Sequence, residues 1–465
     1  MFDALFTTTT EYKKLSHALS GKGACALFGL PASGRAQVYA ALCRQLDKPL
    51  CIVTPGEAEA TRFAADLNTL GIPAAVFPAR DYVLRPIEGT AREYEYRRLA
   101  VLGELVGGRL RAVAVPAEAL TQFTTPKEDF CANTRTLHAG DTLLRDDLLA
   151  ALFGAGYTRR AQVDGPGQFS VRGDIVDIFA PDQKMPVRME FWGDEIDTLH
   201  TFDLTTQRRE DAIDKFYLSP AREVLFGKPA NAAEQLRAFL AKQRGKKKTA
   251  MTDCMAADLD LLDGGAVPVN MDKYLAVRYP HPATVLDYFD DPILVAEEPA
   301  SIREADRATA YRRGEELKSL ILDGVLCAGL DNLYAGPSYL WSKTGHYRTI
   351  CAENFARSMP DQPLKDIINA PAHTLPAWNG EVAGLLEDLK PLCDAGYTVT
   401  LLAGTDRAAA GLARDLRDKG ILVTTDAAAA PAAGLVQVLA GHLSAGCEFP
   451  FVKYALLTGR AFGET

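Results

Sequence analysis

The sequence of 465 residues predicts a multidomain α/β protein. We expect a parallel α/β domain with a degenerate P-loop, a β-rich domain inserted into it, and a small C-terminal α/β domain. The chain is too long for one ordinary core. Predicted strands and helices alternate over the first 125 residues and again after residue 350, as is typical of parallel sheets. Between Gly165 and Arg209, by contrast, strand patterns follow one another without helices.

Composition excludes several classes of protein. The content of 48% hydrophobic and 24% charged residues is ordinary for a soluble globular chain. A net charge of −9 argues against a dedicated DNA-binding surface. The nine cysteines are scattered without a CxxC pair, which favours reduced thiols over a zinc site or a disulfide framework. No apolar run or leader pattern indicates a membrane or secreted protein. Together with the reduced thiols this predicts a cytoplasmic protein, and we also expect a monomer with no metal site.

The first strand and helix flank a loop with the spacing of a phosphate-binding P-loop. The strand is expected at Ala24–Phe28 and the helix at Gln37–Leu46. Four residues define the loop: Gly29, Gly34, Arg35 and Ala36. Arg35 stands where lysine would reach phosphate, and Ala36 stands where a hydroxyl would bind Mg²⁺. Weak nucleotide binding at the helix N-terminus therefore competes with a loop that is kept only for its turn, and we favour the latter.

The remaining elements of the first 125 residues continue the alternation. Strands are expected at 49–54, 74–77 and 111–115, and helices at 57–70 and 93–107. The tyrosines at 82, 94 and 96 could stack on bases, but packing is the simpler interpretation.

Three strands are expected in the β-rich stretch: Gln168–Phe179, Val187–Trp192 and Glu195–Phe202. A glycine that opens the two-residue loop at 193–194 predicts a type II′ hairpin, with Trp192 opposite Glu195 and Phe191 opposite Ile196. One face of this hairpin is then a core, formed by Val187, Met189, Phe191, Ile196 and His200. The other face carries Arg188, Glu190, Trp192, Glu195 and Asp197. A tryptophan beside an arginine is typical of a binding hot spot, although a solvated face would look similar.

The rest of the chain alternates again. Helices are expected at 234–243, 302–320, 381–393 and 406–419, and strands at 292–298, 398–403, 421–425, 436–439 and 454–458. The basic cluster at 244–248 is expected to be a solvated loop, and residues 326–348 have no clear assignment. Glu297 and Glu298 sit near the place where an active helicase would carry an acidic pair that holds Mg²⁺, but without a P-loop lysine they have no triphosphate to act on.

The pattern GYTRRAQVDGPGQFSVRGDIVDIF, followed by PVRMEFWGDEIDTLHTFDLTTQR, extends over Gly156–Arg208. It resembles domain 2 of the UvrB family and, more closely, the matching domain of the Mfd family of transcription-repair coupling factors. The resemblance implies UvrB-like domains 1a (1–125), 2 (126–212) and 1b (213–345), then a small α/β domain (346–465). It also implies that domain 2 docks UvrA, with contacts at Arg172, Arg188 and Trp192, where relatives often have phenylalanine at the last position.

The same resemblance implies a protein that continues beyond this chain. RNA polymerase and double-stranded DNA would be bound by other domains, and ATP and Mg²⁺ would be used by a motor that is absent here. Segment 81–97 is too short for the DNA-clamping hairpin of UvrB. We therefore expect a UvrA-recruiting binding module without a cofactor. The alternative is a UvrB-type ATP-dependent enzyme, and the sequence carries no GxSxG or HExxH motif that would favour a small-molecule enzyme.

Overall fold

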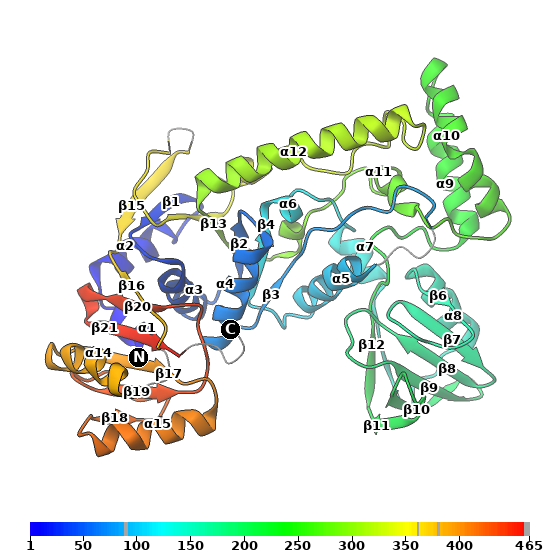
Figure 1. The fold of residues 1–465 in the computed structure, drawn as a ribbon. Coiled ribbons are helices and arrows are strands. Elements are labelled where there is room, and N and C mark those ends of the chain that lie inside the picture. Colours follow the sequence, from blue (N-terminus) through cyan, green and yellow to red (C-terminus); the bar gives the residue numbers. More distant parts are fainter. Residues whose placement is uncertain (88–91, 360–361, 379–381, 460–465) are drawn as a thin grey trace.

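The computed structural model describes residues 1–87, 92–359, 362–378 and 382–459, and it confirms the multidomain α/β fold class. A large sheet lies at the centre. A β-rich inserted domain and a helical hairpin lie at one end of the molecule, and a small α/β domain lies at the other (Figure 1). No helix in the described ranges is long and apolar enough to cross a membrane.

The large sheet has seven strands, all parallel, in the order β15-β1-β14-β13-β2-β4-β3. Its strands are β1 (Gly23–Phe28), β2 (Leu50–Thr54), β3 (Ala74–Val76), β4 (Ala112–Pro116), β13 (Ile293–Glu297), β14 (Arg348–Glu353) and β15 (Leu364–Asn369). The inner strands β2, β4 and β13 are buried along their whole length because helices cover both faces.

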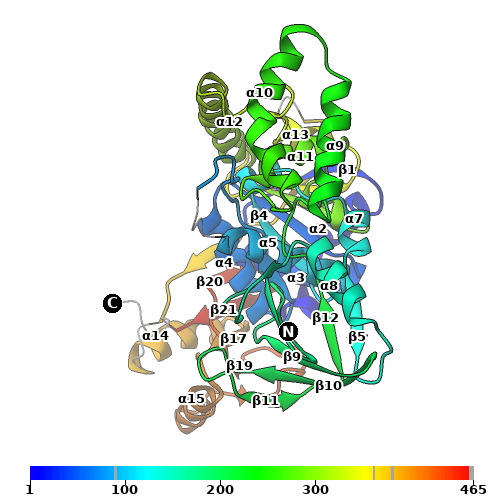
Figure 2. The same ribbon diagram turned by 90° about the vertical axis from the view of Figure 1, so that its right-hand side faces the viewer.

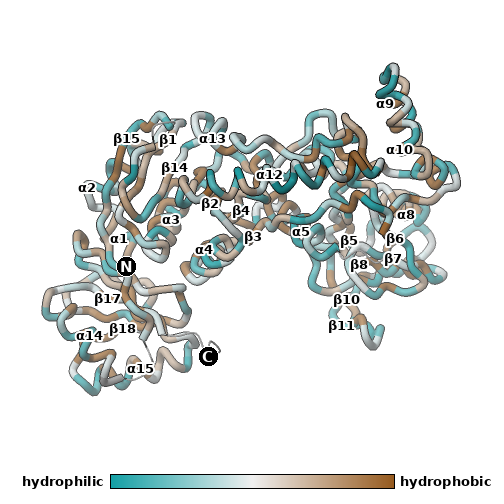
Figure 3. Tube along the Cα trace, turned by 45° about the horizontal axis from the view of Figure 1, so that its top comes forward, coloured by the Kyte–Doolittle hydropathy of each residue, from teal (hydrophilic) through white to brown (hydrophobic). Residues whose placement is uncertain are grey.

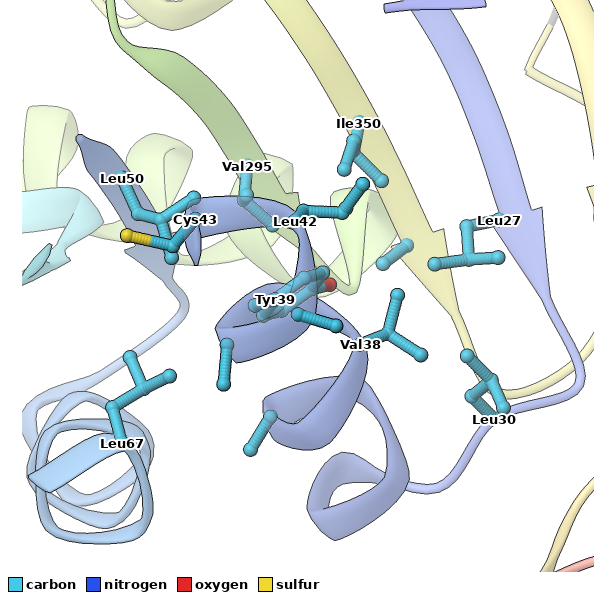
Figure 4. Close-up of a cluster of buried hydrophobic side chains, with 14 of the residues drawn as sticks. Leu27, Leu30, Val38, Tyr39, Leu42, Cys43, Leu50, Leu67, Val295 and Ile350 are labelled. Carbon is cyan, nitrogen blue, oxygen red and sulfur yellow. The ribbon is translucent and has the colours of Figure 1, made fainter. Parts of the chain in front are cut away.

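Helices α1 (Phe2–Phe6), α2 (Thr10–Ala18), α3 (Ala32–Leu46) and α4 (Glu57–Thr69) cover one face. Helices α5 (Glu93–Val106), α6 (Ala117–Leu120), α12 (Pro299–Leu322) and α13 (Tyr339–Lys343) cover the other. Figure 4 shows Val38, Tyr39 and Leu42 of α3 directed at Val295 and Ile350 of the sheet. Figure 3 shows α12 as mainly hydrophilic, in keeping with a helix that lies along the surface.

The expected start of the last domain at residue 346 differs from the structure. Strands β14 and β15 pair on either side of β1 and complete the large sheet, so the small domain begins after Asn369. Sequence alternation could not show this, because a parallel strand looks the same whichever sheet it joins.

The small domain has a second sheet in the order β16-β20-β21-β17-β19-β18. Its strands are β16 (His373–Leu375), β17 (Thr398–Leu402), β18 (Val423–Thr424), β19 (Val436–Leu439), β20 (Gly446–Phe449) and β21 (Tyr454–Thr458). Helices α14 (Val382–Asp394) and α15 (Asp406–Asp418) contribute to its core. Strands β20 and β21 also pack on the first core, where the Phe2 and Phe449 rings lie 4.7 Å apart.

A helical hairpin of α9 (Pro229–Ala241) and α10 (Gly245–Asp263) stands out from the sheet, near α11 (Leu275–Arg278) (Figure 2). The expectation of a loop at 244–248 is wrong, because α10 begins at Gly245 and its lysines occupy the first helical turn. The apolar side chains of Met251, Met255 and Leu262 bury one face of the helix. Only these three apolar residues of the helix are buried, and they lie four and seven residues apart among charged neighbours. The amphipathic pattern is therefore too weak in the sequence to predict this helix.

The inserted domain contains β5 (Arg135–His138), α8 (Arg145–Gly154), β6 (Thr158–Arg159), β7 (Gln168–Arg172), β8 (Ile175–Phe179), β9 (Val187–Trp192), β10 (Glu195–Phe202), β11 (Arg209–Ala212) and β12 (Lys215–Leu218). The strand expected at Gln168–Phe179 is in fact two antiparallel strands that turn at Gly173, which has a φ of +62°. The six-stranded sheet runs β11-β10-β9-β8-β7-β6, and β12 pairs with β5.

Buried ion pairs anchor the segment by which the inserted domain returns to the large sheet. Arg98 Nε of α5 lies 2.6 Å from Glu223 Oε1, and neither side chain is exposed. Arg80 Nη1 lies 2.7 Å from Asp272 Oδ2 nearby. Because breaking such a pair leaves an uncompensated buried charge, these contacts make the return path specific.

Candidate binding surface

The hairpin of β9 and β10 has the predicted register at its turn. Trp192 pairs with Glu195 and Phe191 pairs with Ile196. Gly193 has a φ of +65°, whereas Asp194 keeps a negative φ, as a type II′ turn requires.

The predicted faces hold only as far as Ile196. A bulge between Ile196 and Thr198 shifts the alternation by one residue, so that Leu199 is the core residue opposite Met189. The placement of His200 in the core is therefore wrong, because His200 pairs with Arg188 on the outer face. Val187, Met189, Phe191 and Ile196 do form the core against α8.

A buried carboxylate organises the outer face. Asp177 of β8 has no exposed side-chain area, and it lies between Arg172 and Arg188. Arg188 donates to both of its oxygens, from Nε at 2.7 Å and from Nη2 at 2.9 Å. Arg172 Nη2 donates to Oδ2 at 2.5 Å. The two predicted arginines are thus brought together by an acid of this chain.

Arg188 is held on three sides. Its Nη1 donates to the carbonyl of Gln207 at 3.2 Å, and its guanidinium lies 4.7 Å from the ring centre of Phe202. The hydrogen bonds to Asp177 raise the pKa of Arg188. The loop that presents Gln207 is closed by Asp203, whose Oδ1 accepts from the Thr206 amide at 2.7 Å. The side chain of Arg188 is consequently only 11% exposed, and its fork is already occupied.

Arg172 and Trp192 are the accessible members of the predicted site. The Trp192 side chain is a solvent-exposed ring with a relative exposure of 82%, and that of Arg172 is 46% exposed. Strand β8 lies between β7, which holds Arg172, and β9, which holds Arg188 and Trp192. Arg172 is the last residue of β7 and pairs with Ile175 across the turn to β8, and Trp192 lies at the turn between β9 and β10.

Asp177 is the residue of this surface that the sequence did not lead us to expect. The sequence does contain a sign of it, because Asp177 is the single charged residue in the apolar segment IVDIF, which is typical of a buried strand. A buried acid of this kind requires a partner, and Arg188 of the neighbouring strand is that partner.

In the degenerate loop, the side chain of Arg35 pairs with two acids of this chain. Arg35 Nε lies 2.9 Å from Glu297 Oε2, and its Nη2 lies 2.9 Å from Glu298 Oε1. Burial would lower the pKa of Arg35, but the two carboxylates outweigh it and raise the pKa. Burial raises the pKa of Glu297 although Arg35 opposes it, and Tyr39 donates a hydrogen bond to the same carboxylate. Glu297 and Glu298 thus share the guanidinium of Arg35 as their partner.

Neighbouring segments also cover this loop. A Cβ on Gly29 would lie 2.9 Å from Asn369 Oδ1, and one on Gly34 would lie 2.9 Å from Cys447 Sγ of β20. Ser33 Oγ donates to the Gly446 carbonyl at 3.4 Å. The small domain therefore packs onto the N-terminal turn of α3, where a phosphate group would have to lie.

The tyrosines of segment 81–97 have separate environments. Tyr82 is buried and donates to the Phe123 carbonyl at 2.7 Å, whereas Tyr94 is 45% exposed. Tyr96 accepts a hydrogen bond from Arg222. Within the described ranges, no group of three or more His, Cys, Asp or Glu side chains is arranged to hold a metal ion.

Comparison with known proteins gives this arrangement a context. The UvrB interaction domain family matches residues 136–224, which comprise the inserted domain and its return segment. The transcription-repair-coupling factor of Bacillus subtilis (strain 168) is 26% identical over 444 residues, 93% of this chain and 38% of the relative. That of Staphylococcus haemolyticus (strain JCSC1435) is 24% identical over 455 residues, 94% of this chain and 38% of the relative.

The fold and the matched domain together define a multidomain α/β protein that carries a UvrB interaction domain. More particularly, the chain is related along nearly all of its length to the transcription-repair-coupling factors, known as Mfd. It spans about two-fifths of the length of the curated relatives it matches.

Proposed function

We propose that this chain is a UvrA-recruiting module of a transcription-repair coupling factor, which links stalled transcription to nucleotide excision repair. The observation that carries the proposal is the UvrB interaction domain at residues 136–224, with Trp192 exposed on its outer face. A large exposed aromatic side chain beside a charged rim is typical of an interface centre. Any contact with RNA polymerase or double-stranded DNA is proposed to belong to other parts of such a protein.

In this proposal the three residues of the site have different roles. Trp192 supplies apolar area, and the half-exposed guanidinium of Arg172 is available to meet a carboxylate of UvrA. Arg188 holds Asp177, which in turn orients Arg172. Arg188 therefore supports the surface from within the sheet.

The proposal includes the absence of nucleotide chemistry in this chain. Arg35, Glu297 and Glu298 form a closed set of charges where a triphosphate and Mg²⁺ would be needed. Localisation in the cytoplasm and a monomeric state are part of the same proposal. A UvrB-type ATP-dependent enzyme remains the alternative, favoured by the retained glycine spacing of Gly29 and Gly34 and opposed by the position of Arg35.

The test is calorimetric titration of purified UvrA into this chain. Trp192→Ala and Arg172→Ala are each expected to weaken binding by ~2 kcal/mol, about thirtyfold in Kd. Tyr311→Ala is the matched control, since Tyr311 is a 75% exposed aromatic on α12, far from the inserted domain in sequence. If UvrA binds Trp192→Ala and Arg172→Ala as tightly as the parent, the proposed surface is wrong.

A further inference from the structure

A second candidate site lies on the other side of the inserted domain. A cleft of about 1410 Å³ separates the end of α8, strand β6 and the loop at 164–168 from the base of the α9/α10 hairpin. Figure 1 shows α8 and β6 beneath α9. Strands β7 and β8 separate β6 from β9, so this cleft is distinct from the surface that carries Trp192. A binding role for this cleft would hold whether or not the chain recruits UvrA.

The unpaired charge in the cleft is mainly positive. Arg159, Arg160 and Lys228 are exposed and make no ion pair within the described part of the chain, and Asp164 is an unpaired acid among the lining residues. The other two lining acids, Asp263 and Asp272, already bind arginines. An anionic occupant would therefore gain more contacts than a cationic one.

Exposed aliphatic side chains also line the cleft. Val267 is 58% exposed and Val269 is 37% exposed, an unusual condition for two valines in one short loop. Arg92 donates to the Val269 carbonyl at 2.7 Å and so fixes this loop against the N-terminus of α5. The exposed ring of Phe153 already packs edge-on against Phe169, with their centroids 5.2 Å apart.

The cleft also contains open backbone groups. Strand β6 is the edge of the six-stranded sheet, and its inner hydrogen bonds are made by Thr158 and Arg160 to the carbonyls of Gly167 and Phe169. Strand alternation directs the amide and carbonyl of Arg159 away from β7, and Arg159 is one of the residues that line the cleft. An extended chain can pair there, as in recognition by strand addition.

We propose that this cleft binds an extended acidic peptide segment of a partner protein, with aliphatic side chains on Val267 and Val269 and carboxylates at Arg159 and Arg160. Single-stranded nucleic acid fits less well. It needs several flat rings for stacking and a cation for each of several phosphates. Of the aromatic lining residues, Tyr157 and Phe226 are buried and the exposed ring of Phe153 already packs against Phe169, and the unpaired cations are few.

The proposal is tested by selecting peptides from a displayed random library on the intact chain, and by measuring the enriched peptides by fluorescence anisotropy. We expect enrichment of sequences in which Asp or Glu alternates with Leu, Ile or Val. Arg159→Glu combined with Arg160→Glu should weaken their binding at least tenfold, and Val267→Ser combined with Val269→Ser should do the same. Arg407→Glu combined with Arg414→Glu, on the exposed side of α15, is the matched control and should have no effect.

Three results would overturn the proposal. The first is a library selection that yields no acidic consensus. The second is equal binding of the enriched peptides to the parent and to the Arg159→Glu, Arg160→Glu variant, with an unchanged melting curve. The third is displacement of the peptides by a twelve-residue oligothymidine that binds more tightly than they do at physiological salt, which would assign the cleft to nucleic acid instead.

Discussion

Replacing Arg188 with alanine is expected to destabilise the inserted domain, contrary to what its place on an outer sheet face suggests. The guanidinium of Arg188 makes two of the three hydrogen bonds that the arginines donate to the Asp177 carboxylate, and the side chains of Arg188 and Asp177 are 11% and 0% exposed. In the variant Asp177 would remain buried, with the half-exposed Arg172 as its partner.

The magnitude follows from the burial of this pair. Removing one member of a buried ion pair costs about 3–5 kcal/mol, and the contact with Phe202 adds up to ~1 kcal/mol. Arg172→Ala should cost ~1 kcal/mol or less, because its side chain is 46% exposed and solvent screens its charge. Trp192→Ala should change stability by less than ~0.5 kcal/mol, since the ring packs on little of the chain.

Hydrogen exchange measured by mass spectrometry separates the inserted domain from the rest. Arg188→Ala should lower protection of the 168–202 strands more than a hundredfold, at 1.4 kcal/mol for each factor of ten. Replacing both partners, Arg188→Met with Asp177→Leu, should restore most of the protection because no buried charge is left unpaired. Equal protection in Arg188→Ala and Trp192→Ala would refute the reasoning.

Three further outcomes are expected. Burial raises the pKa of Asp306 to about 6 from its ordinary 3.8, so the folded protein loses stability as pH rises through this range and the buried carboxyl ionises. In thermal melts, Asp306→Asn should therefore be more stable than the parent at pH 7 by up to ~2 kcal/mol, with no gain below about pH 4. A hydrogen bond with Cys327 lowers the pKa of Cys254 to about 7, so the rate at which iodoacetamide labels Cys254 should rise with pH with a midpoint near pH 7. Cys327→Ala should move that midpoint towards ~8.5, and an unmoved midpoint would contradict this. Arg35→Ala should destabilise the large domain by about 3–5 kcal/mol through the unpaired Glu297, and calorimetry should show no Mg-ATP binding to either chain; a saturating isotherm would count against the proposal.

Local patterns predicted most of the fold. Strands β2, β19 and β21 lie within one residue of their expected ranges, because short apolar runs between glycine and proline signals mark buried strands well. Gly193 also predicted its turn correctly, since a positive φ at that position is a property of the residue itself.

The errors came from features that depend on partners. The bulge that reverses His200 has no glycine or proline to mark it, and the assignment of β14 to the large sheet depends on which strand it meets. The site shows the same limit. Arg172, Arg188 and Trp192 were identified by resemblance, but their different exposures follow from strand order.

The sequence by itself determined that this chain is a multidomain α/β protein with a degenerate loop and a β-rich insertion, because these follow from residue type and spacing along the chain. Only the tertiary structure decided that Arg35 would neutralise the acids at 297–298, and that Asp177 would occupy the fork of Arg188. The charge of an arginine can be read from the sequence, but its availability to a partner cannot. That depends on which carboxylate the fold brings within hydrogen-bonding distance, and here the acid that meets Arg35 lies more than 250 residues away.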